Sequence, residues 1–238
     1  MRARPVTRRR VGILGGMGPE ATILLQQRVL ATVRAVDDAD HIPLLIDMNP
    51  QVPSRIAHLI EGTGADPGPV LAAMARRLEA AGASALAMPC NTAHHYAPDI
   101  EAAVSIPFLN MIDLSVGRAM CHLNKGASIG ILASPAVRLA GVFDAPLERA
   151  GLMALWPEDA GRMLDAIRTI KAEGPTPETR RTLEDAAEDL ASRGAAHLFV
   201  ACSEFSLIAD ALPGAVPATD TVDVLADAIH DHTFTNWS

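Results

Sequence analysis

Two cysteines follow apolar, strand-like segments of the sequence and could carry acid–base chemistry. Cys90 lies in MPCNTAHH, residues 88–95, and Cys202 lies in ACSEFS, residues 201–206. Each comes where a strand should end and a helix begin, so free backbone N–H groups and the positive end of a helix dipole would favour a thiolate there. We therefore expect these two thiols to be reactive groups.

The two cysteine segments belong to a longer repeat. VGILGGMGPEAT at 11–22 is echoed by IGILASPAVRLA at 129–140, and ALAMPCNT at 85–92 is echoed by LFVACSEF at 198–205. The two matches have nearly the same separation, which predicts that one α/β unit occurs twice. A carbon acid held between two facing thiols would lose a proton to a thiolate on one face and gain one from the thiol on the other. This chemistry inverts a stereocentre, as in a racemase or epimerase.

Apolar runs typical of buried strands alternate with helical patterns along the whole chain. Helices are expected to end at Gly82 and Gly194, and Thr176 followed by Pro177 is typical of a helix start. This alternation predicts an α/β fold with two similar, pseudo-symmetric domains, each a parallel sheet flanked by helices, and an active site in the cleft between them. Strands buried on both faces are expected at 11–15, 43–48, 84–88, 128–132 and 197–201. The first domain is expected at 9–112 plus 218–238 and the second at 113–217, with 1–8 as a disordered tail.

Composition limits the class of protein. The chain has 238 residues, a formal net charge of −8 and three cysteines. So few cysteines favour a reducing compartment, so we expect a cytoplasmic protein, and the third one, Cys121, is expected to be a small buried side chain in a helix. No apolar run approaches the roughly 20 residues that a membrane helix needs. The arginine-rich start is not followed by a signal-peptide pattern, and the acidic remainder argues against a nucleic-acid partner.

Four segments together resemble the aspartate/glutamate racemase family, most closely its aspartate racemase branch. They are VGILGGMGPEAT, NPQVPSR at 49–55, MPCNTAHH and ACSEFS, and the resemblance spans essentially the whole chain from Val11. It implies two similar α/β domains, catalysis without pyridoxal phosphate or any other cofactor, and a pair of thiols as the two bases. By this similarity Cys90 and Cys202 are the catalytic pair, the last helix at 221–232 packs on the first domain, and the protein is a homodimer.

The resemblance also implies the substrate contacts. Arg55 is similar to an arginine that binds a substrate carboxylate, a task for which a guanidinium fork is well shaped. Lys171 matches another carboxylate-binding position and is one of only two lysines in the chain. Asn91 and Thr92 are expected to donate to the α-carboxylate beside Cys90, and Ser203 keeps the hydroxyl of the family threonine. The remaining expected contacts are Met17 as pocket wall, Gln51 and Ser134.

Three features weaken or leave open the finer assignment. The sequence ASPAVR at 133–138 replaces a threonine- and glycine-containing loop of aspartate racemases, so that only the Ser134 hydroxyl remains there. Glu204 could orient a thiol or could simply be a favourable acid in the first turn of a helix. Thr92 and Ser203 could cap the turns that follow the two cysteines.

Other kinds of site are less well supported by the sequence. The segment GGMGP lacks the G-x-G-x-x-G spacing of a dinucleotide site and indicates close approach of backbone to a ligand. Cys90 with His94 and His95 has no second cluster at zinc spacing, so we expect no metal site.

The sequence therefore predicts an amino-acid racemase that needs no pyridoxal phosphate and acts on a small acidic amino acid, aspartate first and glutamate second. Three alternatives stay open. One is an isomerase or decarboxylase of small dicarboxylates from the same superfamily. Another is a non-catalytic protein that binds an acidic metabolite. A hydrolase with a cysteine nucleophile and a histidine base is the third, and the matched second cysteine favours the racemase over it.

Overall fold

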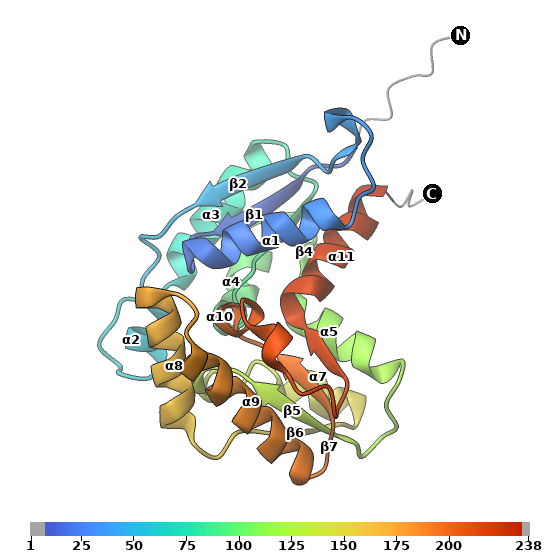
Figure 1. Ribbon diagram of the computed structural model, residues 1–238. Coiled ribbons are helices and arrows are strands. Elements are labelled where there is room, and N and C mark those ends of the chain that lie inside the picture. The colour runs from blue at the N-terminus through green and yellow to red at the C-terminus, as the bar shows by residue number, and fades with distance from the viewer. Residues whose placement is uncertain (1–7, 235–238) are drawn as a thin grey trace.

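The computed structural model describes residues 8–234, which form two parallel β-sheets flanked by helices (Figure 1). The strand order is β2-β1-β3-β4 in the first sheet and β6-β5-β7-β8 in the second. The two orders are equivalent, as expected if one α/β unit occurs twice. The strands are β1 (Val11–Gly15), β2 (Leu44–Met48), β3 (Ala85–Ala87), β4 (Phe108–Leu109), β5 (Ser128–Leu132), β6 (Met153–Leu155), β7 (Ala195–Val200) and β8 (Ala218–Asp220).

Helices cover both faces of each sheet. Apolar residues of α3 pack on one face of the first sheet, and those of α1 and α11 pack on the other. In the second sheet, α8 and α9 cover one face and α5 and α7 cover the other. The α-helices are α1 (Pro19–Ala31), α2 (Arg55–Leu59), α3 (Gly68–Ala80), α4 (Ala97–Glu101), α5 (Met111–Met120), α6 (Pro135–Leu139), α7 (Asp144–Ala150), α8 (Ala160–Glu173), α9 (Pro177–Ser192), α10 (Ser203–Ser206) and α11 (Thr221–Phe234), and the short 3-10 helices are η1 (Asp38–Asp40), η2 (Thr92–Tyr96) and η3 (Ala209–Ala211).

The helix start predicted at Thr176 and the helix ends predicted at Gly82 and Gly194 are confirmed. The Thr179 N–H donates to the Thr176 hydroxyl (3.2 Å), and the Thr176 N–H donates to the Thr179 hydroxyl (2.9 Å), which satisfies two free donors at the start of α9. Gly82 and Gly194 follow the ends of α3 and α9 with φ of 93° and 92°. This left-handed conformation favours glycine because a side chain would strain it.

Matching glycines show that the repeat extends to the packing of the sheets. A Cβ added to Gly12 in β1 would lie 2.9 Å from Leu86 Cδ2, and one added to Gly130 in β5 would lie 2.6 Å from Leu198 Cδ2. In both sheets the crowding leucine comes from the neighbouring central strand. Glycine at both positions therefore lets equivalent strands and helices pack closely in the two units.

Two expectations are wrong in detail. The segment at 43–48 forms a strand, but β2 is the edge of its sheet, so Ile46 is 37% and Met48 40% exposed rather than buried on both faces. Cys121 is exposed because α5 ends at Met120, which places this cysteine at the helix terminus, outside the packed face. Edge position and helix length depend on tertiary packing, which the local pattern does not contain.

The last helix, α11, packs on the first sheet, as expected. Its apolar face joins the cluster that contains residues of β1 and α1. At its surface Arg28 of α1 pairs with Asp223 (3.1 Å) and Arg118 of α5 pairs with Asp227 (2.8 Å). The expected domain limits stay a prediction, but the chain returns to the first sheet between β8 and α11.

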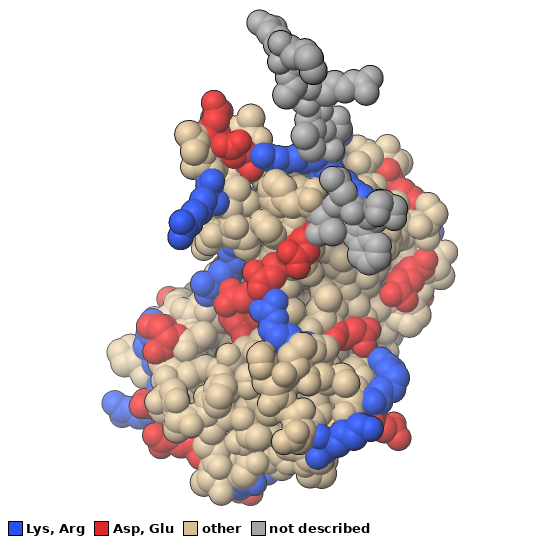
Figure 2. Space-filling model, turned by 90° about the vertical axis from the view of Figure 1, so that its right-hand side faces the viewer, with Lys and Arg blue, Asp and Glu red and all other residues tan. Residues whose placement is uncertain are grey.

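Charges of both signs are interspersed on the face of the molecule drawn in Figure 2, so positive charge does not form one continuous area on that face. No helix within residues 8–234 is both long enough and apolar enough to cross a membrane.

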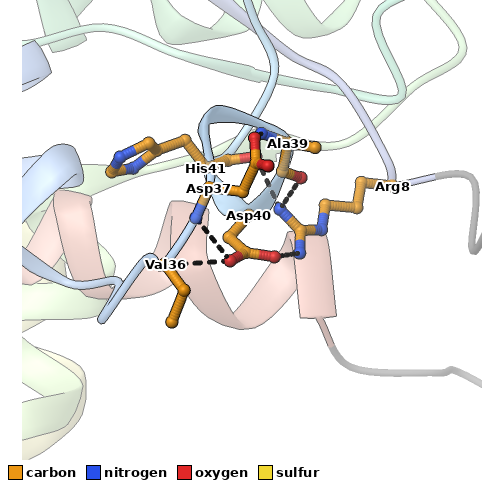
Figure 3. Close-up of polar contacts among 6 residues, drawn as sticks. All are labelled: Arg8, Val36, Asp37, Ala39, Asp40 and His41. Atoms are coloured by element: carbon orange, nitrogen blue, oxygen red, sulfur yellow. Dashed lines mark hydrogen bonds and ion pairs between the residues drawn. The ribbon is translucent and has the colours of Figure 1, made fainter.

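Arg8 connects the first described residues to two later segments. Its guanidinium donates to the carbonyls of Ala39 (2.6 Å) and His41 (2.9 Å) and lies 3.7 Å from Asp40 (Figure 3). It also lies over the Phe234 ring at the end of α11, 5.0 Å from the ring centroid. Apart from Arg8, the expected disordered tail at 1–8 lies outside the described residues. The start and the end of the described chain are therefore neighbours.

Candidate active site

A small cavity lies where loops from the carboxyl ends of the two sheets meet, which is the usual position for a ligand in open parallel sheets. Its volume of about 90 Å³ is several times the ~10–15 Å³ that one water occupies by a comparable measure. The cavity therefore suits a small metabolite. It is lined by Met17, Ser54, Arg55, Ile56, Cys90, Asn91, Thr92, Ser134, Val137, Ile167, Lys171, Ala201, Cys202, Ser203 and Glu204.

Cys90 follows the end of β3 and lines the cavity from the first sheet. The residue is buried, with 9% of its surface exposed, and its N–H donates to the Met88 carbonyl (2.9 Å) in a tight turn. The short helix η2 begins two residues later. This turn directs the chain from the strand end into the wall of the cavity.

His94 holds the Cys90 turn in place. Its Nδ1 lies 2.8 Å from the Cys90 carbonyl, and its Nε2 accepts the Met111 N–H (3.1 Å), so the ring is the neutral tautomer protonated on Nδ1. Burial lowers the pKa of His94 to about 4. Within residues 8–234 there is no cluster of three or more potential metal ligands, and both nitrogens of His94 are already engaged by backbone groups.

Cys202 lines the same cavity from the second sheet and is held as a thiol. It follows β7 and precedes α10, and its Sγ donates to Glu204 Oε2 at 2.9 Å. Burial, and next the Glu204 carboxylate, raise the pKa of the Cys202 thiol well above its ordinary value. The two cysteines of the repeat therefore occupy one cavity. Cys202 is in the form of an acid, so the expectation that a helix start favours its thiolate is wrong, because burial and the Glu204 carboxylate outweigh the backbone N–H group.

Glu204 links Cys202 to Lys171. Its second oxygen lies 3.2 Å from Lys171 Nζ. Burial disfavours the charged ammonium, but the Glu204 carboxylate, and the sulfurs of Cys202 and Cys90 when they are ionised, outweigh this effect and raise the pKa of Lys171, which is therefore protonated. Of the two possibilities that the sequence left open for Glu204, the structure shows that it contacts a thiol, and it also lies in the first turn of α10.

Arg55 has a guanidinium without an acidic partner among residues 8–234. It begins α2, where the Ser54 hydroxyl accepts the Ala57 N–H (3.2 Å). Its guanidinium donates only to backbone carbonyls, those of Pro53 (3.0 Å) and, at longer range, Val52 and Met17. Its positive charge is thus uncompensated at the cavity wall, as a carboxylate-binding group requires.

Asn91 makes a contact that the sequence did not predict. Its Nδ2 donates to the Thr221 hydroxyl (3.1 Å), which in turn donates to the Val200 carbonyl (3.1 Å). Because the hydroxyl proton is used at Val200, the hydroxyl oxygen can only accept from Asn91, which fixes the orientation of the amide. One amide N–H is therefore committed to Thr221 and not to a ligand.

The other expected residues are mostly in place. Met17, Thr92, Ser134 and Ser203 line the cavity, whereas Gln51 is exposed and does not line it. The suggested caps are wrong: no side-chain cap begins η2 or α10. Residues that line the cavity but were not expected there include Ser54, Ile56, Val137, Ile167 and Ala201. Two of these residues could have been predicted from the sequence: Ser54 precedes Arg55, and Ile167 lies one helical turn before Lys171.

The fold is similar to those of solved α/β racemases. It superposes on Picrophilus torridus aspartate racemase with a TM-score of 0.84 and 25% identity, over 97% of this chain and 96% of that one. PH1733, an aspartate racemase homologue from Pyrococcus horikoshii OT3, gives a TM-score of 0.73 at 20% identity, over 95% of this chain and 100% of that one. At the lower identity the likeness shows the fold alone.

A family model described as Asp/Glu/Hydantoin racemase matches residues 14–229. The chain therefore belongs to the Asp/Glu/hydantoin racemase family, which confirms the resemblance seen in the sequence. Among curated proteins, the broad specificity amino-acid racemase RacX of Bacillus subtilis (strain 168) is 24% identical over 224 residues, which cover 91% of this chain and 94% of RacX.

Proposed function

We propose that this protein is an amino-acid racemase that needs no pyridoxal phosphate and inverts the α-carbon of an acidic amino acid, aspartate first and glutamate second. The observation that carries the proposal is the placement of Cys90 and Cys202 on one small cavity, with Cys202 held as a thiol by Glu204. The name of RacX supports tests of further amino acids if the acidic ones do not react.

In the proposed reaction the two thiols exchange roles in each direction. The Cys90 thiolate removes the α-proton of one enantiomer, and the Cys202 thiol gives its proton to the opposite face of the same carbon. The products are the other enantiomer, a Cys90 thiol and a Cys202 thiolate, which is the starting arrangement for the reverse direction. Lys171 lies close enough to offset part of the negative charge that Cys202 and Glu204 would then share.

Two cations are available for two carboxylates of the substrate. Arg55 provides an uncompensated guanidinium, and Lys171 provides an ammonium that Glu204 orients. Removing an α-proton from an amino acid without an electron sink builds negative charge on the substrate, and fixed cations stabilise that charge only if they are already in position. The backbone contacts of Arg55 and the ion pair of Lys171 provide such fixed positions.

The test is proton NMR of L-aspartate and, separately, D-aspartate, incubated with the reduced protein in D2O without pyridoxal phosphate. Loss of the α-proton signal together with the other enantiomer on chiral chromatography is the expected result. Exchange without inversion would refute racemisation. Thermal stabilisation by aspartate without exchange would indicate a binding protein instead.

Replacement of Glu204 by glutamine is expected to lower racemisation by roughly 10- to 100-fold, within the range of general acid–base effects. The carboxylate raises the pKa of Cys202, so its removal lowers that pKa and the acid is lost at a lower pH. The alkaline limit of the pH–rate profile should therefore move to lower pH.

Glu173→Gln is the matched control because it makes the same charge change at the exposed end of α8, two residues from Lys171. Its profile should equal that of the parent protein. An alkaline limit that stays in place in Glu204→Gln would show that Glu204 does not act through the Cys202 thiol.

The proposal also has consequences for the setting of the protein. A pair of catalytic thiols must stay reduced, which supports a cytoplasmic location. The resemblance to the family supports a homodimer.

A further inference from the structure

The two cysteine loops are joined by a buried chain of hydrogen bonds. Asn91, which follows Cys90, donates to Thr221, and Thr221 donates to the carbonyl of Val200, two residues before Cys202. Asn91 is 3% exposed and Thr221 is fully buried. Because Thr221 is fully buried, loss of its hydroxyl would leave the Val200 carbonyl without this hydrogen-bond donor and the Asn91 amide without this acceptor.

Thr221 is also the point where the chain passes from one sheet to the other. It follows β8 of the second sheet and begins α11, which packs on the first sheet. The preceding Asp220 accepts from the Ser206 hydroxyl (2.9 Å), and that hydroxyl lies 3.4 Å from the Cys202 carbonyl. This junction therefore contacts the loops of both cysteines, although Thr221 does not line the cavity.

We propose that Thr221 is a positioning residue that sets the separation of the Cys90 and Cys202 thiols across the cavity. The inference rests on the proposed two-thiol reaction, in which both sulfurs must reach one carbon from opposite faces. Proton transfer requires close approach of donor and acceptor, and a misplacement of about 1 Å can lower a rate by roughly 100-fold. Thr221 is suited to this role because its single hydroxyl bonds to both loops.

The spacing can be measured without substrate. In a Cys121→Ser background, which removes the exposed third thiol, bifunctional methanethiosulfonates of increasing length would join Cys90 to Cys202. The parent is expected to give a high yield at one narrow range of lengths. Thr221→Val keeps the shape but removes the hydroxyl, and it should give a broader range and a lower yield, while Thr221→Ser should restore the parent pattern.

The kinetic test compares the effect of each variant on kcat with its effect on KM. Thr221→Val should lower kcat by about 10- to 100-fold and leave KM nearly unchanged, because the residue does not touch the cavity. Thr233→Val is the matched control: it removes another buried threonine hydroxyl from α11, one that bonds only to the Ile229 carbonyl of its own helix (2.9 Å). Its cross-linking pattern and kcat should equal those of the parent.

Each outcome bears on the proposal. If Thr221→Val keeps the cross-linking pattern and kcat of the parent, the positioning role is refuted; Thr221→Ala serves as a second variant if the valine protein does not fold. A parent in which a monofunctional methanethiosulfonate modifies both Cys90 and Cys202, but in which no bifunctional length joins them, would overturn both this inference and the two-thiol reaction. A parent that cross-links but does not racemise would refute the proposed function alone, since the spacing in Thr221→Val would still be measurable.

Discussion

Cys202→Ala and Cys90→Ala are each expected to lose racemisation by 1,000-fold or more, as the removal of an essential acid or base implies. In D2O the two variants should nevertheless differ. The remaining thiol can still remove and return a proton on its own face, so each variant should exchange the α-proton of one enantiomer only. The enantiomer that Cys202→Ala still exchanges is the one that Cys90 deprotonates.

The exposed Cys121 supplies the control for these variants. It lies at the end of α5, outside the cavity lining, so Cys121→Ala should racemise like the parent. Substantial racemisation by either Cys90→Ala or Cys202→Ala would end the two-thiol scheme. Exchange of both enantiomers by one variant would mean that another group in the cavity acts as a base.

His94 and Asp220 are expected to give the protein opposite pH dependences of stability in the same pH range. Burial lowers the pKa of His94 from 6.5 to about 4, so the unfolded chain binds a proton that the folded one does not, and stability rises as the pH increases from 4 to 6.5. Burial raises the pKa of Asp220 from 3.8 to about 6, so the folded chain holds a proton that the unfolded one loses, and stability falls as the pH increases from 4 to 6. Each effect amounts to roughly 3 kcal/mol over its range.

Urea unfolding measured between pH 4.5 and 6.5 should separate the two effects, because each single variant removes one of them. Asp220→Asn keeps acceptors for the Ser206 hydroxyl and the Val222 N–H, so it should remove only the falling term and make stability rise more steeply with pH. His94→Gln should remove the contribution of His94, which increases with pH. The stability of this variant should therefore fall, relative to that of the parent, as the pH increases. Other titrating groups are common to all three proteins and cancel in these differences. Equal slopes in the parent and both variants would contradict this account.

The fold and the centre of the site could be predicted because their signals are local or repeated. Strands such as 11–15 and 128–132 are short apolar runs between turn residues, and the matched cysteine segments indicated which loops meet at the cavity. Arg55 and Lys171 were found through a resemblance and not through spacing. That Lys171 is paired with Glu204 was not predictable, because the two residues lie on different helices.

The remaining features depend on contacts between distant parts of the chain. Thr221 lies 130 residues from Asn91, and no local pattern distinguishes a hydroxyl that joins two loops from one that begins a helix. His94 was considered only as a metal ligand, because its partners, the Cys90 carbonyl and the Met111 N–H, are backbone groups without a sequence signature. Gln51 was expected in the cavity because it lies in NPQVPSR, one of the segments that carry the resemblance, but a shared segment does not determine the direction of each side chain.

The return of the chain at Thr221 has a consequence for synthesis of the protein on the ribosome. The second sheet is formed by a continuous segment from Ser128 to Asp220, so it is complete before the last helix has been made. The first sheet begins earlier, but the face that contains Val11 and Ile13 is covered by α1 without α11 until the end of the chain emerges. The half that is translated first is thus the half that is completed last. Until α11 has been made, the nascent chain exposes apolar surface through which it can associate with other chains.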